Sequence, residues 1–419
     1  FPLIEDDSVA NFILTGNHSL VQVAGDMNGW NPTSGGYTMV KVPSTNFFFL
    51  SKYFETNARL DYKFVTDGST WILDPNNPNQ VSGGFGPNSE LKMPFYVDPW
   101  EIESYPQVAK GGISTHNFSS TYLNGNYEVK VYIPAGYDST LSYPTAYFHD
   151  GTEYISLASA VNVLDNLIDS GLVEPLIGVF VKPNDRNEEY AFSKKDAYTD
   201  FFVKELVPWV DGNWSTQQDS SRRATIGASF GANISMYICL KHPEVFYKTG
   251  QHSGAWWPEQ FKVLNMYSTT AHTDLPMAGV WGSYEGGLHD MWEVVRDSSN
   301  FYGYTNKYFN YYPEGHSWGL WRATTDELLI QLFPGTAVVS IPERDLSASW
   351  TVYPNPADDF LQVDGENLRG KEAHIFNLSG EPVLEMKIPD DLRIDLRTLN
   401  SGLYLLSIEG KTLRLKILR

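Results

Sequence analysis

Apolar runs alternate with amphipathic segments through the middle of the chain, from about residue 101 to 335. The runs that predict buried strands are Tyr127–Ile133, Thr145–His149, Leu176–Val181, Arg223–Ile226 and Pro276–Trp281. Apolar spacing near 3.6 residues predicts helices over Val161–Ile168, Phe201–Val210, Ala232–Leu240 and Asp326–Phe333. Such alternation predicts a largely parallel sheet with helices on both faces.

The two ends of the chain carry a different pattern, in which short alternating runs are separated by turn clusters. Near the beginning, Val21–Ala24, Phe47–Leu50 and Leu60–Val65 predict a small antiparallel β-sandwich. After residue 350 the chain returns to short β runs. We therefore expect a β-sandwich over 1–100, an α/β domain over 101–335, a linker over 336–349 and a second β domain over 350–419.

One motif in the α/β domain predicts chemistry. Gly227-Ala228-Ser229-Phe230-Gly231 has the form G-x-S-x-G, between a predicted strand and a predicted helix, as a nucleophile elbow requires. The turn is so tight that a side chain in place of either glycine would strike the neighbouring backbone. Ser229 would project from the carboxyl edge of the sheet, with the amino terminus of the helix pointing at it. Ser229 is therefore the candidate nucleophile, and a glycine-rich turn without catalytic function is the alternative.

A serine hydroxyl is a weak nucleophile until a base takes its proton. His316 is the candidate base because it lies on a glycine-containing loop just after the strand-like run Tyr308–Tyr312. The other candidates suit the role less well: His18, His116 and His374 fall outside the catalytic sheet or near its edges, His242 precedes a proline at a helix end, and a pocket wall is favoured for His252. A structural loop residue is the alternative for His316.

A third group should hold the imidazole and stabilise its charged form. In the order serine, acid, histidine, this carboxylate lies between Ser229 and His316. Glu285 follows the strand Pro276–Trp281 and is the first candidate. Asp290 is its main competitor and Asp274 a weaker one, and a serine–histidine pair without an acid stays open.

Two backbone donors are needed to hold the oxyanion of an acyl-transfer reaction. We expect one from Phe230, directly after the nucleophile, and one from Gly151 or Thr152, in the loop after Thr145–His149. The aromatic residues that could line a pocket for an aromatic acyl group or a sugar are Trp256, Trp257, Trp318 and Trp321. Core packing is an equal alternative for these rings.

Over about 240 residues these features resemble the putative-esterase family of α/β-hydrolases, which includes feruloyl, acetylxylan and enterochelin esterases. The motifs that carry the resemblance are His149-Asp150-Gly151, Asn184-Asp185-Arg186, the elbow, Ser253-Gly254-Ala255-Trp256-Trp257 and Gly315-His316-Ser317-Trp318. The resemblance implies an α/β-hydrolase fold, ester hydrolysis without cofactor or metal, and Arg186 as a further pocket residue. Ala232 departs from the pattern, because many relatives carry a second glycine there.

Residues 1–100 resemble an early-set, immunoglobulin-like β-sandwich of the glycogen-binding type. The resemblance rests on Gly25-Asp26-Met27-Asn28-Gly29-Trp30-Asn31 and on Tyr62–Gly68 with Trp71. It implies that Trp30 and Trp71 form a stacking platform for sugars. A structural or pocket-shaping role for the module is the alternative.

Residues 350–419 resemble the type A sorting domain of the type IX secretion system. The motifs are Tyr353-Pro354-Asn355-Pro356-Ala357, Ile375–Gly380, Leu399–Tyr404 and a closing basic run, Lys411–Arg419. The resemblance implies a small β-sandwich, recognition by the type IX secretion machinery, and export across the outer membrane to a secreted or surface-attached state.

Composition narrows the function further. The formal net charge of −20 disfavours nucleic acid as a partner, because phosphate binding needs basic patches. No apolar run approaches the length of a membrane span. The sequence begins at Phe1 without an initiator methionine, and we expect it to be a processed or trimmed product.

The first functional hypothesis is a secreted serine esterase that removes feruloyl or acetyl groups from plant polysaccharide. A siderophore-ester hydrolase of the enterochelin type is an alternative, which export away from the cell disfavours. The other alternative is a non-catalytic glycan-binding protein on a hydrolase scaffold. Retention of Ser229, a carboxylate and His316 disfavours that reading.

Overall fold

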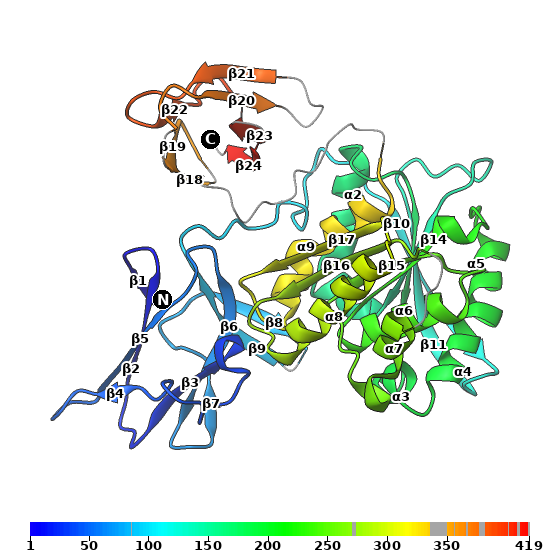
Figure 1. Ribbon diagram of the computed structural model, residues 1–419, viewed down its shortest axis with the longest axis horizontal. Coiled ribbons are helices and arrows are strands. Elements are labelled where there is room, and N and C mark those ends of the chain that lie inside the picture. The colour runs from blue at the N-terminus through cyan, green and yellow to red at the C-terminus, as the bar shows by residue number, and fades with distance from the viewer. Residues whose placement is uncertain are drawn as a thin grey trace. The chain divides into compact units, whose positions relative to one another are not determined.

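The computed structural model describes residues 1–84, 86–269, 274–335, 350–355, 357–365, 368–376, 382–400, 402–408 and 411–417. Residues Phe1–Asp169 and Val173–Pro334 form one compact unit, and a second unit holds Gly335–Arg419 with Ser170–Leu172 (Figure 1). The predicted linker, 336–349, lies outside the described residues. The first unit therefore contains both the predicted N-terminal sandwich and the predicted α/β domain.

The N-terminal part of the first unit is a sandwich of two antiparallel sheets. One sheet has the order β1 (Leu3–Glu5), β2 (Val9–Thr15), β5 (Phe47–Tyr53), β4 (Val40–Lys41). The other has the order β3 (Val21–Gly25), β6 (Arg59–Thr66), β9 (Gly86–Lys92), β8 (Gln80–Gly83), with β7 (Thr70–Ile72) on β6. Alternate residues of β2, including Phe12, point into a core that also holds Phe48 and Phe64. The predicted β-rich N-terminal region is thus confirmed.

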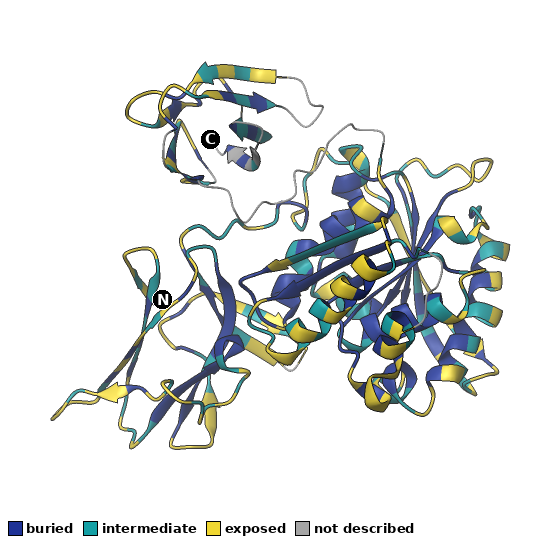
Figure 2. Ribbon diagram, viewed as in Figure 1, coloured by how far each residue is buried: buried dark blue, intermediate teal, exposed yellow. Residues whose placement is uncertain are grey.

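The rest of the first unit is built on an eight-stranded sheet (Figure 1). Its order is β10 (Gly112–Ser120), β11 (Gly125–Ile133), β13 (Ile177–Val181), β12 (Thr145–His149), β14 (Arg223–Ala228), β15 (Lys248–His252), β16 (Met277–Gly282), β17 (Lys307–Tyr312). β10, β11 and β13 pair antiparallel, and β13 to β17 pair in parallel. Every residue of β12, β13, β14 and β16 is buried, as strands covered on both faces require (Figure 2).

Helices connect and cover these strands. They are α1 (Gly151–Ser156), α2 (Ala160–Asp169), α3 (Arg186–Ala191), α4 (Lys195–Asp200), α5 (Val207–Asn213), α6 (Phe230–Lys241), α7 (Pro258–Thr269), α8 (Gly287–Phe301) and α9 (Trp318–Leu332). The helix predicted over Phe201–Val210 is divided into a π-helical turn, Phe201–Leu206, and α5. Pro208 lies next to the junction of these two segments, and because it lacks a backbone N–H it cannot donate to the preceding turn.

The C-terminal unit consists of antiparallel strands in two sheets. The first has the order β18 (Trp350–Tyr353), β19 (Phe360–Gly365), β22 (Arg393–Asp395). The second has the order β21 (Pro382–Lys387), β20 (Glu372–Phe376), β23 (Gly402–Ile408), β24 (Lys411–Ile417). Leu361, Val363, Ile375 and Leu406 share its buried core. The predicted small C-terminal β domain is confirmed.

Candidate active site

Ser229 lies at a sharp turn between β14 and α6. Its backbone has φ 58° and ψ −116°, a conformation that a residue with a side chain rarely adopts. A Cβ on Gly227 would lie 2.2 Å from the backbone carbonyl of Gly231, so the glycine is required by the closeness of the turn. The strained backbone and the close glycines give this segment the geometry of a nucleophile elbow.

Two helix amino termini meet beside Ser229. α6 begins at Phe230 after β14, and α1 begins at Gly151 after β12, and these two strands are parallel neighbours. The N–H groups in the first turn of a helix have no partner within the helix and carry a partial positive charge. Phe230, Gly151 and Thr152, the predicted oxyanion donors, all belong to such first turns. The arrangement suits the binding of an anion at this edge of the sheet.

The predicted acid and base are close together. Nδ1 of His316 lies 3.4 Å from Oε2 of Glu285, in loops that follow the parallel neighbours β17 and β16. The side chain of Glu285 is fully buried, whereas that of His316 is 34% exposed. A buried carboxylate beside Nδ1 fixes the imidazole and leaves Nε2 free to exchange a proton with a substrate or a serine.

Glu285 is itself held by two hydrogen-bond donors. Its Oε1 accepts hydrogen bonds from Ser253 Oγ, at 2.5 Å, and from the backbone N–H of Gly282, at 2.9 Å. Ser253 Oγ accepts in turn from the indole N–H of Trp321, at 2.8 Å. The Trp321 ring also packs edge-on against His316, with 5.1 Å between centroids. Ser253 had no predicted role, although its position directly after β15 marks it as a residue of the same sheet edge.

Within the described residues, no hydrogen bond joins Ser229 Oγ to His316. In unliganded enzymes such bonds are often long and tighten only with substrate.

Asp290, the competing acid, lies in the first turn of α8. Asp274, the weaker one, accepts hydrogen bonds from Thr305 and Asn306 instead. Of the three carboxylates, Glu285 is therefore the one whose contact with His316 the structure contains.

The predicted pocket residues divide into exposed and buried ones. Trp257 is 46% exposed and forms an aromatic cluster with Phe230 and Phe192, at centroid distances of 5.2 and 6.2 Å. Trp256 has no exposed surface and packs against Trp292, which favours the core-packing alternative for this ring. Trp318 is 7% exposed and packs between other aromatic rings.

The guanidinium of Arg186 is hydrogen-bonded to two residues close to the elbow. Its Nε and Nη2 each donate to the Asp150 carboxylate at 2.7 Å, and Nη2 also donates to the carbonyl of Ala228 at 3.1 Å. Burial opposes the charge of Arg186, but the adjacent Asp150 outweighs it and raises the pKa of the guanidinium. Arg186 thereby ties the loop after β12 to the end of β14.

Two other histidines lie near this edge of the sheet. His149 and His252 are fully buried, and burial lowers the pKa of each to about 3. Both are therefore neutral at ordinary pH, and neither is available as a base for a substrate.

No cluster of three or more metal-ligating side chains occurs among the described residues.

The predicted sugar platform also has a defined geometry. Trp30 and Trp71 stack with their ring centroids 6.4 Å apart and an interplanar angle of 25°. Trp71 is 44% exposed, and the indole N–H of Trp30 donates to Oδ1 of the buried Asp26, at 3.1 Å. An exposed indole ring such as that of Trp71 is a surface on which an apolar sugar face can pack.

Comparison with known proteins agrees with this fold. Residues 351–417 match the family model described as "Secretion system C-terminal sorting domain". This type IX sorting domain marks the chain for export, to a secreted or surface-attached state. In the part of the chain that the structure describes, no helix has the length and apolar character needed to cross a membrane.

Similar proteins occur in several bacteria. The uncharacterized protein YbbA of Bacillus subtilis is 28% identical over 165 residues, which are 36% of this chain and 63% of that protein. A protein of Xylanibacter ruminicola named endo-1,4-beta-xylanase/feruloyl esterase is 29% identical over 169 residues, 37% of this chain and 23% of that protein. The match thus spans less than two thirds of the length of either relative.

Among solved structures, the ferric enterobactin esterase of Salmonella typhimurium superposes with a TM-score of 0.66 at 19% identity. The superposition covers 78% of this chain and 94% of that one, and it shows the shared α/β-hydrolase fold. The family model described as "Putative esterase" matches residues 120–332, which include Ser229, Glu285 and His316 and amount to more than half of the sequence. The chain therefore belongs to the putative esterase family.

Proposed function

We propose that this chain is a secreted serine esterase that removes feruloyl or acetyl groups from plant polysaccharide through an acyl-serine intermediate. The observation that carries the proposal is the contact between Glu285 and His316 at the sheet edge where Ser229 stands on its strained elbow. The loops concerned follow β14, β16 and β17, in an order of serine, acid and histidine along the chain.

In the first half of the reaction, Nε2 of His316 takes the proton of the Ser229 hydroxyl as Oγ attacks the ester carbonyl carbon. The negative charge that develops on the carbonyl oxygen is stabilised by the N–H groups of Phe230 and of Gly151 or Thr152. The bond from carbon to the leaving oxygen then breaks. His316 returns the proton to that oxygen, so the sugar leaves as an alcohol and Ser229 stays acylated.

In the second half, His316 takes a proton from water, and the water oxygen attacks the acyl carbon. The same backbone donors hold the second oxyanion. When the bond to Ser229 Oγ breaks, the serine recovers a proton from His316 and the acid is released. Throughout, the Glu285 carboxylate stabilises the imidazolium without accepting its proton.

Three observations favour an acylated polysaccharide as substrate. The cluster of Phe192, Phe230 and Trp257 lies beside the nucleophile and offers apolar rings to an aromatic acyl group. The Xylanibacter relative carries xylanase and feruloyl esterase in its name. Export by the sorting domain brings the enzyme to the polymers outside the cell. We further propose that the Trp30–Trp71 pair binds sugar residues of such a polymer.

The first experiment compares the wild type with Ser229→Ala on p-nitrophenyl acetate, methyl ferulate, acetylated xylan and a catecholate siderophore ester. We expect wild-type hydrolysis of the first three, and a loss of about 1,000-fold or more in kcat for Ser229→Ala. A fluorophosphonate should label Ser229 in the wild type, as located by mass spectrometry of the peptides.

Ser298→Ala, a change on α8 that removes only a hydroxyl donating to Val294, is the matched control and should keep full activity. Activity that survives in Ser229→Ala would reject the mechanism. Hydrolysis of the siderophore ester alone would favour the enterochelin-type alternative. No hydrolysis by the wild type, together with binding to xylan, would leave a glycan-binding protein.

A further inference from the structure

A buried arginine of the N-terminal sandwich lies at the boundary with the hydrolase sheet. Arg59 begins β6 and has no exposed surface. Its Nη2 lies 2.7 Å from Oδ1 of Asp61, and its Nε donates to Oε1 of Glu90 at 2.7 Å. Burial opposes the charge of Arg59, but these carboxylates outweigh it and keep the pKa of the guanidinium well above its usual value. The charged fork is thus fixed from within the sandwich.

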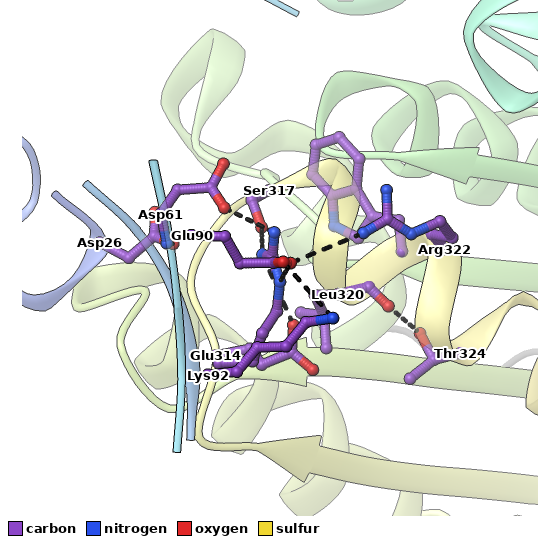
Figure 3. A network of polar contacts seen from close by, with 12 residues as sticks. Asp26, Asp61, Glu90, Lys92, Glu314, Ser317, Leu320, Arg322 and Thr324 are labelled. Atoms are coloured by element: carbon purple, nitrogen blue, oxygen red, sulfur yellow. Dashed lines mark hydrogen bonds and ion pairs between the residues drawn. The ribbon is translucent and has the colours of Figure 1, made fainter. Parts of the chain in front are cut away.

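The free end of this fork reaches the loop that carries His316. Nη1 of Arg59 donates to Oγ of Ser317 at 3.2 Å and lies 3.9 Å from Oε2 of Glu314. The backbone N–H of Arg59 also donates to the carbonyl of Pro313, at 3.2 Å. Figure 3 shows Asp61 and Glu90 from the sandwich close to Glu314 and Ser317 from the loop, in one network of polar contacts. These contacts lie on both sides of His316 in the sequence.

Two glycines show how closely the loop is fitted to the sandwich. A Cβ on Gly319 would lie 1.8 Å from Nη1 of Arg59, and a Cβ on Gly315 would lie 2.1 Å from Cγ of Asp26. Asp26 is itself immobilised, because its carboxylate accepts from the backbone N–H of Asp61 at 2.7 Å. The residue directly before His316 therefore has no room to move toward the sandwich.

The loop of the predicted acid is held by the same sandwich. Tyr284, next to Glu285, donates its hydroxyl to Oε2 of Glu55 at 2.5 Å and packs its ring against Phe54, with 6.3 Å between centroids. Its backbone N–H donates to the carbonyl of Glu314 at 3.1 Å, which links the two loops. The sandwich thus contacts a neighbour of Glu285 and neighbours of His316.

We infer that Arg59 is a positioning residue for His316, and that the N-terminal sandwich completes the active site by fixing the loops of both His316 and Glu285. This inference rests on the proposed function, since it assigns His316 as the base. Arginine suits the task better than lysine, because its planar fork can hold Asp61, Glu90 and Ser317 at once in fixed directions. A change at Arg59 should therefore alter the orientation of a base that it does not touch.

The test uses the full chain with Arg59→Lys, which keeps the charge and loses the fork. We expect kcat on p-nitrophenyl acetate to fall about 10- to 100-fold with little change in KM, as a misplaced catalytic group predicts. The acid limb of the kcat/KM pH profile should also move, because the imidazole is displaced from Glu285. The matched control is Arg223→Lys, another buried guanidinium, paired with Asp211 at 2.6 Å at the opposite end of β14. It should lower the melting temperature and leave kcat unchanged.

Ser317→Ala and Tyr284→Phe provide milder versions of the same test. Each removes one hydroxyl that joins a loop to the sandwich, and each should lower kcat by part of the Arg59→Lys effect. Combining Ser317→Ala with Arg59→Lys should cost no more than Arg59→Lys alone, because both interrupt one contact. If Arg59→Lys does not fold, these two variants decide the question, and wild-type kcat in both would overturn the inference.

The outcomes separate the two proposals. Wild-type kcat in folded Arg59→Lys, or an equal loss in Arg223→Lys, overturns the positioning role while an inactive Ser229→Ala still supports the serine mechanism. Full activity in Ser229→Ala overturns the mechanism itself, whatever the arginine variants do.

Discussion

Nδ1 of His316 faces Oε2 of Glu285 at 3.4 Å, and the carboxylate is closed off from solvent. Glu285→Gln keeps an oxygen for the bonds from Ser253 and Gly282 but removes the charge beside the imidazole. We expect kcat to fall roughly 100- to 10,000-fold while the fold is retained, because the imidazolium loses its counterion and its tautomer is no longer enforced. Steady-state kinetics on p-nitrophenyl acetate measure the loss.

Asp290→Asn is the control for this prediction, since Asp290 lies in the first turn of α8. It should keep near-wild-type kcat. The reverse result, with Asp290→Asn impaired and Glu285→Gln active, would assign the acid to Asp290.

Trp257 should select for aromatic acyl groups. Because it is 46% exposed and packs against Phe230, Trp257→Ala removes a ring that a feruloyl group could contact. An aromatic contact contributes about 0.5–1.5 kcal/mol, so KM for methyl ferulate should rise about 2- to 10-fold while KM for p-nitrophenyl acetate stays unchanged. Phe301→Ala removes a ring that is 82% exposed on α8 and serves as the control. An equal rise for both esters would contradict a selective acyl pocket.

The stacked tryptophans of the sandwich should bind polysaccharide independently of catalysis. Trp71→Ala should weaken retention on insoluble xylan or starch about 2- to 10-fold, the equivalent of one lost aromatic contact. Hydrolysis of a small soluble ester should not change. Tyr53→Ala, which removes an aromatic residue that is 80% exposed on the same sandwich, should bind as the wild type does. Equal retention of Trp71→Ala and the wild type would instead favour a structural role for the pair.

Buried neutral histidines should make the fold sensitive to acid. The pKa of His149 is lowered from 6.5 to about 3 by burial and by nearby Arg186. Between these two values the unfolded chain binds the proton and the folded chain does not, so stability is present above pH 6.5 and is lost as the pH falls toward 3. His149→Gln should reduce the slope by up to about 1.4 kcal/mol per pH unit in urea unfolding from pH 7 to pH 4. An unchanged slope would show that His149 takes up no proton on unfolding.

The elbow should not tolerate a methyl group. In Gly227→Ala the new Cβ would meet the Gly231 backbone at 2.2 Å, so the variant should lose about 1–3 kcal/mol or more of stability and react slowly with a fluorophosphonate. Gly212→Ala is the control, because a Cβ there meets nothing within 4 Å and the residue lies in α5. That change should stabilise the chain by about 0.5–1 kcal/mol. Wild-type labelling of Gly227→Ala would show that the turn can relax.

Much of the fold could be predicted because buried parallel strands leave continuous apolar runs. The run Thr145–His149 coincides with β12, and Arg223–Ile226 differs from β14 only at its end. α9 was harder, since it begins at Trp318 rather than at Asp326. Its first turns contain Gly319, a poor helix former that is there because Arg59 occupies the space beside it. The first turns of α9 could therefore not be predicted, because their glycine is required by a tertiary contact rather than by helix propensity.

In the candidate site, only the residues that a local sequence motif marks could be predicted. Ser229, Glu285 and His316 each follow a recognisable strand, and strand ends of a parallel sheet meet at one edge. The arginine that contacts the His316 loop gave no such signal. Arg59 and Asp61 alternate with apolar residues on β6, which in sequence is typical of a solvent-facing strand side. Arg59 is covered by a loop more than 250 residues further along the chain.

Gly315 and Gly319 make the hydrolase part of the chain depend on the particular sandwich that precedes it, because side chains of that sandwich occupy the space beside both glycines. A hydrolase domain joined to an unrelated sandwich would keep the spaces beside these glycines and the acidic Glu314. It would lose the Arg59 guanidinium and the Asp26 carboxylate that fill those spaces, and with Arg59 the positive charge beside Glu314. Such a chimera would carry an unfilled gap and an uncompensated charge within a few residues of His316, the proposed base. An exchange of the N-terminal sandwich should therefore transfer β6 together with the segment 313–319.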